Sequence, residues 1–397
     1  MVKEFSDEAK NNIFYILLNN NSPLFEKNKI SNPKNKVEAG GISFSSREEA
    51  LAKCIGEYVE RFSSFYYEKK SFVYKSHIEL KNSINPRFFQ DKKDIEKKKF
   101  YWAKTIRLSD KSEYFLPAHL VFLDYFTEDF MNLSVSMSTG AASATDISTA
   151  LLRGIYEVIE RDTFMTTYLT KARVKRIDVS TIHDKKVQFI HSQSKKYQFE
   201  LYLFDITNDF GIPSFLSILV DQTGIGPGIL IGTKTSLNVI EAIIGSMEEA
   251  FMGRVWARVM IQKRKSNNLT IKGERIKTKE QRALFWSNPR MINKLDFLFR
   301  EKENAFRDKN YPRSVEESLA IVVQKIQKKG FDIYYRDITH KIFKSSKFVT
   351  VKTFIPGMQP LYLDEGQKVL VLKRLNDVSK YFKQKVLEIN KVPHPAL

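Results

Sequence analysis

The 397-residue sequence contains a single cysteine, Cys54, and only six histidines. One cysteine excludes an internal disulfide and a cysteine-rich zinc site, and the histidines show no metal-ligand spacing. No run approaches the roughly 18 consecutive apolar residues of a membrane helix, and the polar residues 1–8 do not resemble a signal peptide. A Gly-x-x-x-x-Gly-Lys phosphate loop is also absent. These absences favour a cytoplasmic protein without a membrane segment, in which any nucleotide chemistry uses another kind of site.

Basic residues are in excess, with 65 Lys and Arg against 46 Asp and Glu, which gives a net charge of +19. Clustered basic residues can neutralise nucleic-acid phosphates. Here the basic runs, such as 97–99 and 263–265, are scattered, and no recognised nucleic-acid module interleaves them with aromatics. We interpret them as a solvated surface and expect no nucleic-acid partner. Attraction to an acidic peptide or to nucleotide phosphates is the alternative.

The order of apolar patterns predicts a mixed architecture, because 42% hydrophobic residues can bury a large core. Helical spacing predicts helices over residues 47–65, 146–169, 237–258, 315–328 and about 367–387, with Ser46 as the N-cap of the first. β-type runs predict strands over 116–123, 199–206, 214–220, 228–232, 331–337 and 348–354. Residues 19–36 have loop composition. Mixed strands and helices of this kind predict an α+β fold.

A segment that occurs twice is the most informative feature of the sequence. Residues 49–61, EALAKCIGEYVER, correspond without a gap to residues 149–161, TALLRGIYEVIER. In each copy a Glu-x-x-Glu-Arg triplet lies on one face of a helix. The triplets are Glu57, Glu60 and Arg61, then Glu157, Glu160 and Arg161. A third segment has Ala242 and Glu249 at the same spacing, followed by Arg254, with Met252 where the second carboxylate would stand.

One such triplet is ordinary surface chemistry, because an i,i+4 ion pair contributes only about 0.2–0.5 kcal/mol. Two copies with matching apolar flanks favour a duplicated subdomain whose acidic helices converge on one site. Convergent carboxylates repel each other unless a cation neutralises them, and Mg²⁺ prefers oxygen ligands. The pattern therefore predicts a metal site formed by the five carboxylates Glu57, Glu60, Glu157, Glu160 and Glu249.

From about residue 39 onward the sequence resembles the YcaO family, in five regions that keep the family's order. These regions are Ser46 to Phe62, the small-residue loop 138–142 with 157–162, residues 205–207 with 211–213, Glu249-Ala250 with Arg254, and 355–361 (Ile-Pro-Gly-Met-Gln-Pro-Leu). The resemblance implies a YcaO-type catalytic domain over 39–397 that follows an N-terminal extension, 1–38. It also implies an ATP- and Mg²⁺-dependent enzyme that phosphorylates a backbone amide oxygen of a peptide.

The resemblance further assigns roles to single residues. Nucleotide and metal would be held by Ser46, Glu57, Glu60, Arg61, Glu157, Glu160, Arg161, Glu249 and Arg254. Arg61 and Arg161 would also act in catalysis by offsetting phosphate charge. The tail 392–397 is similar to the Pro-rich ends of ring-forming subunits, which implies that Leu397 lies near the active site, with His394 as a candidate base. Thr149 and Met252 depart from the family's pattern and remove possible metal contacts.

The function implied is a cyclodehydratase subunit that converts Cys, Ser or Thr of a ribosomal precursor peptide to thiazoline or oxazoline rings. Thioamide or amidine formation, and a non-catalytic scaffold with the same fold, are the alternatives. Since no leader-peptide-binding module is evident, we expect a separate partner resembling ubiquitin-activating enzymes. A flavin dehydrogenase partner and a homodimer are further expectations.

Overall fold

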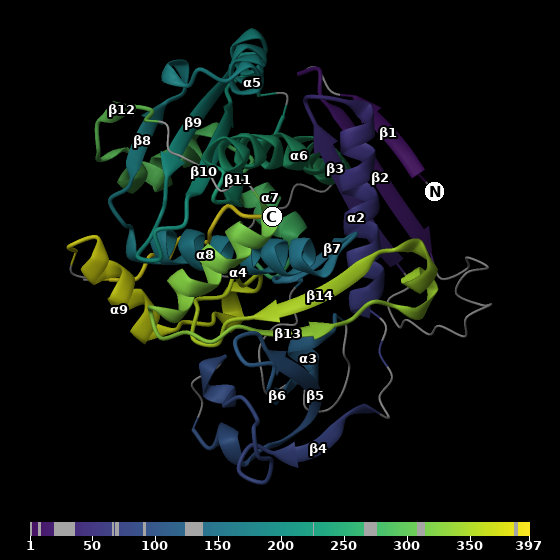
Figure 1. Cartoon of the computed structure of the whole chain (residues 1–397). Coiled ribbons are helices and arrows are strands. Elements are labelled where there is room, and N and C mark those ends of the chain that lie inside the picture. Colours follow the sequence, from purple (N-terminus) through teal and green to yellow (C-terminus); the bar gives the residue numbers. More distant parts are fainter. Residues whose placement is uncertain are drawn as a thin grey trace.

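The computed structural model describes residues 2–6, 9–19, 36–65, 67, 71–89, 93–123, 138–224, 226–265, 276–307, 314–384 and 388–397. Within these ranges the chain forms three sheets with helices packed between and around them (Figure 1). This arrangement confirms the predicted α+β class. No described helix combines the length and apolar character needed to cross a membrane.

Three sheets organise the strands, and only the β8–β12 pair is parallel among the described strand pairs. The first sheet has the order β1-β2-β3, with β1 Val2–Ser6, β2 Asn12–Asn19 and β3 Lys36–Ser43. The second has the order β11-β10-β9-β8-β12, with β8 Lys175–Asp178, β9 Phe199–Asp205, β10 Ser214–Asp221, β11 Ile229–Thr235 and β12 Glu303–Ala305. The third has the order β4-β5-β13-β14-β7, with β4 Val73–Ser76, β5 Lys99–Arg107, β13 Tyr334–Asp337, β14 Val349–Phe354 and β7 Ala141–Ala144, and β6 Glu113–Pro117 pairs with β5.

The α-helices are α2 Arg47–Phe65, α3 Ala118–Val121, α4 Ile147–Thr170, α5 Lys185–Lys196, α6 Val239–Lys265, α7 Lys279–Phe285, α8 Val315–Gln327 and α9 Leu372–Tyr381. A 3₁₀ helix covers Pro289–Phe299. Helix α2 begins where predicted, because Ser46 Oγ accepts a hydrogen bond from Glu49 N at 3.1 Å. Asp146 caps α4 in the same way, through a 2.8 Å bond from Thr149 N. The two carboxylate-bearing helices therefore start at the same position of the repeat.

Each repeat unit consists of a strand and a helix that packs directly on it. The first unit is β3 with α2, the second is β7 with α4, and the third is β11 with α6. At Gly41 in β3 a Cβ atom would come within 2.2 Å of Ala50 O in α2, and at Gly232 in β11 it would come within 2.1 Å of Ser246 O in α6. Glycine permits this close approach because it has no side chain. These close contacts set the distance between the helix and the strand in each of the two units, and this distance fixes the position of the carboxylates.

The five-stranded sheet carries apolar side chains on both faces, and each face has its own core. One face packs on α5 and α6, through residues such as Leu203 and Leu219. The other packs on the second half of α4 and on the 3₁₀ helix 289–299, through residues such as Phe204 and Ile218. The nearly continuous burial of β10 follows from this covering of both faces.

Some of the sequence predictions are wrong in part. The strand predicted over 116–123 ends at Pro117, and residues 118–121 form the short helix α3, because proline has no N–H to continue the ladder. The last helix begins only at Leu372 rather than near 367, since Gln359 binds the backbone of Val369 and Val371 and holds it extended. The predicted loop 19–36 falls mostly outside the described residues.

The predicted boundary after residue 38 lies within β3, where β3 pairs with β2 along its whole length from Lys36 to Ser43. The described N-terminal strands are therefore joined by sheet hydrogen bonds to the first repeat unit. The strand expected from 331 starts at Tyr334.

Candidate active site

Three glutamates, one from each repeat unit, bind a backbone N–H of the segment that precedes their helix. Glu57 accepts from Gly40 N at 2.9 Å, and Glu157 accepts from Gly140 N at 2.9 Å. Glu249 accepts from Thr233 N at 2.6 Å. The first two bonds span 17 residues and the third spans 16. The third segment is therefore a structural copy of the other two, and the shared bond orients one carboxylate per copy.

Two arginines lie among these carboxylates. Arg161 is within 3.7 Å of Glu157, 3.6 Å of Glu160 and 3.7 Å of Glu249, so it joins the second copy to the third. Arg61 contacts Glu57 at 3.1 Å and Glu60 at 3.9 Å, and it also interacts electrostatically with Glu157. The two Glu-x-x-Glu-Arg helices and Glu249 therefore converge on one site.

The second glutamates of the two triplets, Glu60 and Glu160, differ from each other in their environment. Glu160 is buried and accepts from Thr233 Oγ1 at 2.9 Å and from Thr235 N at 3.3 Å. Glu60 lies 3.9 Å from Arg61 Nε, and its side chain is only partly exposed. Burial raises the pKa of Glu60 well above its ordinary value, helped by Glu157 and Glu57 and opposed by Arg61. The contact with Arg61 therefore does not fully offset the cost of burying the charge of Glu60.

Three lysines at the site were not predicted from the sequence. Lys352 of β14 is buried, donates to Thr139 O at 2.7 Å and interacts with Glu60 and Glu157. Burial lowers the pKa of Lys352 to about 8, although both carboxylates oppose the shift. Lys234 interacts electrostatically with Glu160. Lys279, at the start of α7, is exposed and interacts electrostatically with Arg61 and Arg161. Partial desolvation, followed by these two positive charges, lowers the pKa of Lys279.

Little in the sequence could have selected these lysines from 65 basic residues. Lys352 gives the one usable signal, because it lies inside a β-type run of buried residues, where an ammonium group needs a partner. Lys234 and Lys279 come to the site through long-range packing.

The third copy keeps the first glutamate of the triplet and loses the rest. Met252 packs against the first unit, since a Cβ atom at Gly40 would lie 2.1 Å from its Cε. Gly253 occupies the position of Arg61 and Arg161. Arg254, one residue further along α6, forms a buried ion pair with Asp221 and lies over the ring of Phe199 at 4.2 Å. These contacts place Arg254 in the core of its own unit rather than beside Glu249, in contrast to the grouping expected from the sequence.

The C-terminal tail enters the molecule beside this third copy. Pro393 O accepts from Tyr168 Oη and from Trp286 Nε1, both at 3.1 Å, and His394 O accepts from Arg282 at 2.6 Å. Leu397 then reaches α6, where a Cβ atom at Gly253 would lie 3.8 Å from Leu397 Cδ1. Figure 1 shows the C-terminus at the centre of the molecule, close to α7. Because the third copy has Gly253 in place of the arginine, Leu397 can lie against α6 at this position.

His394 is not placed to act as a base. Its Nε2 lies 2.6 Å from Tyr362 O, which fixes a proton on that nitrogen, and the ring is buried. Burial, followed by the charge of Arg282, lowers its pKa well below the ordinary value. The histidine therefore anchors the tail.

Residues 44–359 match the family described as YcaO cyclodehydratase, ATP- and Mg²⁺-binding. The chain belongs to the YcaO family. ATP and Mg²⁺ are accordingly the cofactors of this YcaO chain. An uncharacterised protein of Methanothermobacter thermautotrophicus is 23% identical over 344 residues, which cover 83% of this chain and 85% of that protein.

Solved structures share the fold. A heterocyclase in complex with substrate and cofactor has a TM-score of 0.77 at 17% identity and covers 100% of this chain, which spans 54% of the heterocyclase's length. The YcaO protein of Methanopyrus kandleri bound with AMPPCP and Mg²⁺ has a TM-score of 0.65 at 13% identity, with 90% and 86% of the two chains covered. The Escherichia coli microcin synthetase McbBCD complex with pro-MccB17 bound gives 0.64 at 13% identity, with 89% and 86% covered.

The site of this YcaO chain fits Mg²⁺ held together with phosphates. Within the described ranges, no three His, Cys, Asp or Glu side chains are already gathered as a metal-ion site. Mg²⁺ commonly takes only one or two protein carboxylates and completes its shell with water and substrate phosphates. Glu60 and Glu160 are oxygen donors whose raised pKa values show that added positive charge would be favourable. Arg61 and Arg161 beside them suit phosphate oxygens.

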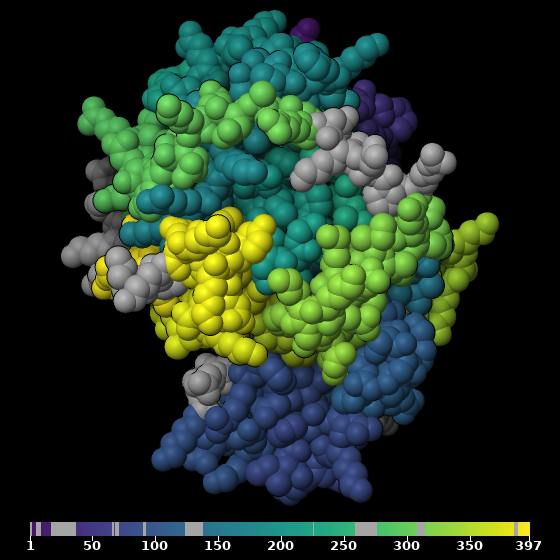
Figure 2. All heavy atoms as spheres, turned by 60° about the vertical axis from the view of Figure 1, so that its left-hand side comes forward, coloured from purple at the N-terminus to yellow at the C-terminus, as the bar shows by residue number. Residues whose placement is uncertain are grey.

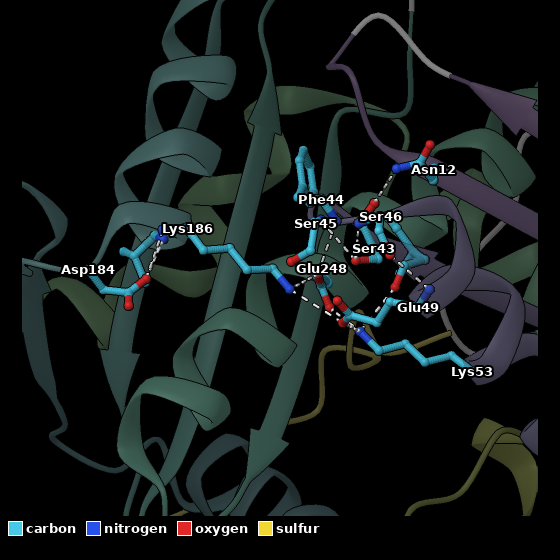
Figure 3. A network of polar contacts seen from close by, with 12 residues as sticks. Asn12, Ser43, Phe44, Ser45, Ser46, Glu49, Lys53, Asp184, Lys186 and Glu248 are labelled. Carbon is cyan, nitrogen blue, oxygen red and sulfur yellow. Dashed lines mark hydrogen bonds and ion pairs between the residues drawn. The ribbon is translucent and has the colours of Figure 1, made fainter.

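Figure 3 shows a second polar network at the start of α2, which joins the first and third units of the YcaO domain. Glu248 accepts from Phe44 N at 3.2 Å and pairs with Lys53 at 2.7 Å and Lys186 at 2.9 Å. Glu49 pairs with the same two lysines, and although burial opposes the shift, they lower the pKa of Glu49 to about 2. Glu248 and Glu249 thus face different partners: Glu248 holds α2 in place, and Glu249 points to the candidate site.

Ser46 and Thr149 have local roles in the structure. The Ser46 hydroxyl caps α2, and the Thr149 hydroxyl binds Asp146 Oδ2 at 2.8 Å, next to the N-cap of α4. Ser46 lies at the helix N-terminus, where backbone N–H groups favour phosphate.

Mg²⁺ binding to this site is expected to strengthen between about pH 6 and pH 8. Burial raises the pKa of Glu160 to about 7, helped by Glu249 and opposed by Arg161. Because the metal needs the ionised carboxylate, binding near pH 7 releases a proton. The raised pKa also means that, without metal, stability falls as pH rises toward 7. Calorimetry with Mg²⁺ and a non-hydrolysable ATP analogue, in buffers of different ionisation heat, measures the released proton. In Glu160→Gln the contribution of this residue to proton release should vanish, and unchanged release would assign it elsewhere.

Proposed function

We propose that this chain is the ATP- and Mg²⁺-dependent cyclodehydratase subunit that converts Cys, Ser or Thr of a ribosomal precursor peptide to thiazoline or oxazoline. The observation that carries the proposal is the convergence of both Glu-x-x-Glu-Arg helices, in which Arg61 interacts with Glu157 of the other copy. The match to the YcaO cyclodehydratase family supports it. We place the protein in the cytoplasm, where precursor peptides are made.

In the proposed reaction, phosphorylation turns the amide oxygen of the peptide, which is a poor leaving group, into a good one. The thiol or hydroxyl would lose its proton and add to the preceding carbonyl carbon, and the carbonyl oxygen would take the γ-phosphoryl group of ATP with release of ADP. The oxygen then leaves as phosphate while the amide nitrogen loses its proton and forms the C=N bond. The peptide loses the atoms of one water, and ATP becomes ADP and phosphate.

The residues of this chain would act by position and charge. We assign Glu60 and Glu160 as metal ligands, supported by Glu57, Glu157 and Glu249, whose bonds to backbone N–H groups hold them in place. Arg61 and Arg161 would hold the phosphates and offset charge as the phosphoryl group moves. Ser46 is assigned to the phosphates because it stands at the start of α2.

The proposed partners are a precursor peptide and a separate subunit that binds its leader. The microcin synthetase complex with pro-MccB17 bound is a fold neighbour that works as an assembly, which supports this arrangement. A flavin dehydrogenase that oxidises azolines and a second copy of this chain are further proposed partners.

The test is to incubate the chain, its partner, a precursor peptide and Mg-ATP, and to measure ADP and peptide mass. Loss of one water per ring, matched by ADP release, is the expected result. Replacement of oxygen by sulfur would instead identify thioamide formation. A chain that binds no ATP in the presence of Mg²⁺ would be a scaffold, and the proposed function would fail.

Deleting Leu397 is expected to lower ring formation at least about tenfold while ATP-analogue affinity changes less than about twofold. The anchors of the tail at Pro393 and His394 remain, so the fold should be kept and only the end of the tail, which lies against α6, should change. Leu397→Met, which keeps an apolar side chain at position 397, is the matched control and should retain activity. Equal rates for the deletion variant and the intact chain would remove the terminus from catalysis.

A further inference from the structure

A small apolar pocket lies next to the candidate site, on the side of α4 that carries Val158 and Arg161. Its volume is about 110 Å³. Phe88, Phe89 and Leu120 line one wall and come from the lower lobe, defined here as residues 71–89 and 93–123. Figure 2 shows this lobe below the C-terminal segments in yellow. The opposite wall is the segment 354–361, which contains the Ile-Pro-Gly-Met-Gln-Pro-Leu motif.

The motif wall is firmly held, so the pocket is present before any ligand binds. Gln359 N donates to Asp162 Oδ1 at 2.8 Å, and Asp162 forms a buried ion pair with Arg374 at 2.7 Å. The Gln359 side chain donates to Val369 O at 2.7 Å and accepts from Val371 N at 2.9 Å. Gly357 has φ +89°, a backbone conformation that favours glycine, and it lies beside Phe331 and Phe88. Asp162 follows Arg161 directly, so the same helix turn fixes both the wall and the site.

The two charged residues that line the pocket connect it to the carboxylates. Arg161 reaches Glu157, Glu160 and Glu249, and Lys352 interacts with Glu60 and Glu157. A group in the pocket would therefore lie next to the place where the phosphates are proposed to bind. The occupant of the pocket should therefore be part of a molecule whose reacting group lies beside the phosphates.

The chemistry of the walls favours an apolar side chain over a nucleobase. A volume near 110 Å³ is far below the roughly 300–1,000 Å³ of pockets for whole small molecules, so one side chain or one ring would fill it. A buried base edge needs hydrogen-bond partners. Four of the polar side chains here already have theirs: Gln359 as above, Thr353 Oγ1 with Gly140 O at 3.0 Å, Lys352 with Thr139 O, and Arg161 with Glu160 at 3.6 Å.

We propose that this pocket binds an apolar side chain of the peptide substrate, that of the residue whose carbonyl is activated. The inference rests on the proposed function, because it takes a peptide as the substrate. It gives the Ile355 to Leu361 motif a role in substrate selection, beside the two arginines that serve the phosphates.

The test uses synthetic peptides that differ only in the residue X before a single Cys, with X as Gly, Asp, Leu or Phe. Binding is measured by calorimetry with the full chain, Mg²⁺ and a non-hydrolysable ATP analogue, and turnover is measured separately with Mg-ATP and the partner. Leu or Phe is expected to bind about tenfold or more tightly than Gly or Asp, since one or more buried methylenes give discrimination of this order. Leu120→Ala and Phe88→Ala should reduce the preference. Ile78→Ala, an exposed residue of the lower lobe outside the pocket, should keep it.

The two measurements separate the two claims. Binding that prefers Leu or Phe without turnover would support the pocket and count against the cyclodehydratase function. Turnover with equal binding of all four peptides would overturn the pocket and leave the function intact. Absence of binding by any peptide would also overturn the pocket. A loss of ATP-analogue affinity in Leu120→Ala, with unchanged peptide preference, would assign the pocket to the nucleobase and overturn the inference.

Discussion

Replacing Glu60 by Gln is expected to lower ATP turnover by at least about 100-fold and to leave the folded chain as stable as before, or more stable. Glu60 lies 3.9 Å from Arg61 Nε, and burial beside Glu157 and Glu57 raises its pKa. An ionised group with a raised pKa costs stability at neutral pH, so a neutral amide of the same shape removes that cost. The same change removes a proposed metal ligand and its charge. Loss of a group that only orients a ligand already costs on the order of 10–100-fold in metal affinity, and loss of the ligand should cost more.

Opposite changes in stability and turnover distinguish a metal ligand from a structural residue. The measurements are ADP release under saturating peptide and the denaturant midpoint of the metal-free chain. Glu48→Gln is the matched control, because Glu48 is exposed in the first turn of the same helix. Loss of turnover in the control, or normal turnover in Glu60→Gln, would contradict the assignment. Glu160→Gln should lose turnover similarly.

Replacing Arg282 by Met is expected to destabilise the fold by about 3–5 kcal/mol, the usual cost of breaking a buried ion pair by removing one partner. Arg282 is fully buried, pairs with Glu365 at 2.9 Å and donates to His394 O at 2.6 Å and Leu363 O at 2.7 Å. Without it, two carbonyl groups lose their partner, and the buried carboxylate of Glu365 keeps only the ion pair with Lys368 at 3.1 Å. The tail that carries Leu397 should then detach more easily.

Urea unfolding gives the change in stability, and the rate of carboxypeptidase digestion gives the release of the tail. Arg290→Met is the control, since Arg290 is exposed and lies in the 3₁₀ helix that follows α7. Digestion should be much faster for Arg282→Met than for the control. A destabilisation below about 1 kcal/mol, with the tail still protected, would show that the other anchors at Tyr168 and Trp286 are sufficient.

Local structure was largely predictable because it depends on neighbours in the sequence. The helix over 47–65 was located correctly from its apolar spacing and its Ser46 cap, and the helix over 146–169 was placed within one residue at its end. The errors came where a distant contact decides the backbone. Gln359 holds residues 369–371 extended, so the last helix starts later than its own pattern predicts.

The sequence alone determined that two Glu-x-x-Glu-Arg triplets lie on helices in equivalent positions, because periodicity and capping are local and the copies share both. Only the tertiary structure decided that these helices face each other, that Glu249 joins them through Arg161, and that Arg254 turns instead to Asp221. It alone also brought Lys352 and the 355–361 motif to the site, because those contacts depend on how sheets and helices pack. Packing between segments hundreds of residues apart leaves no periodic signal in the chain, and so it could not be predicted from the sequence.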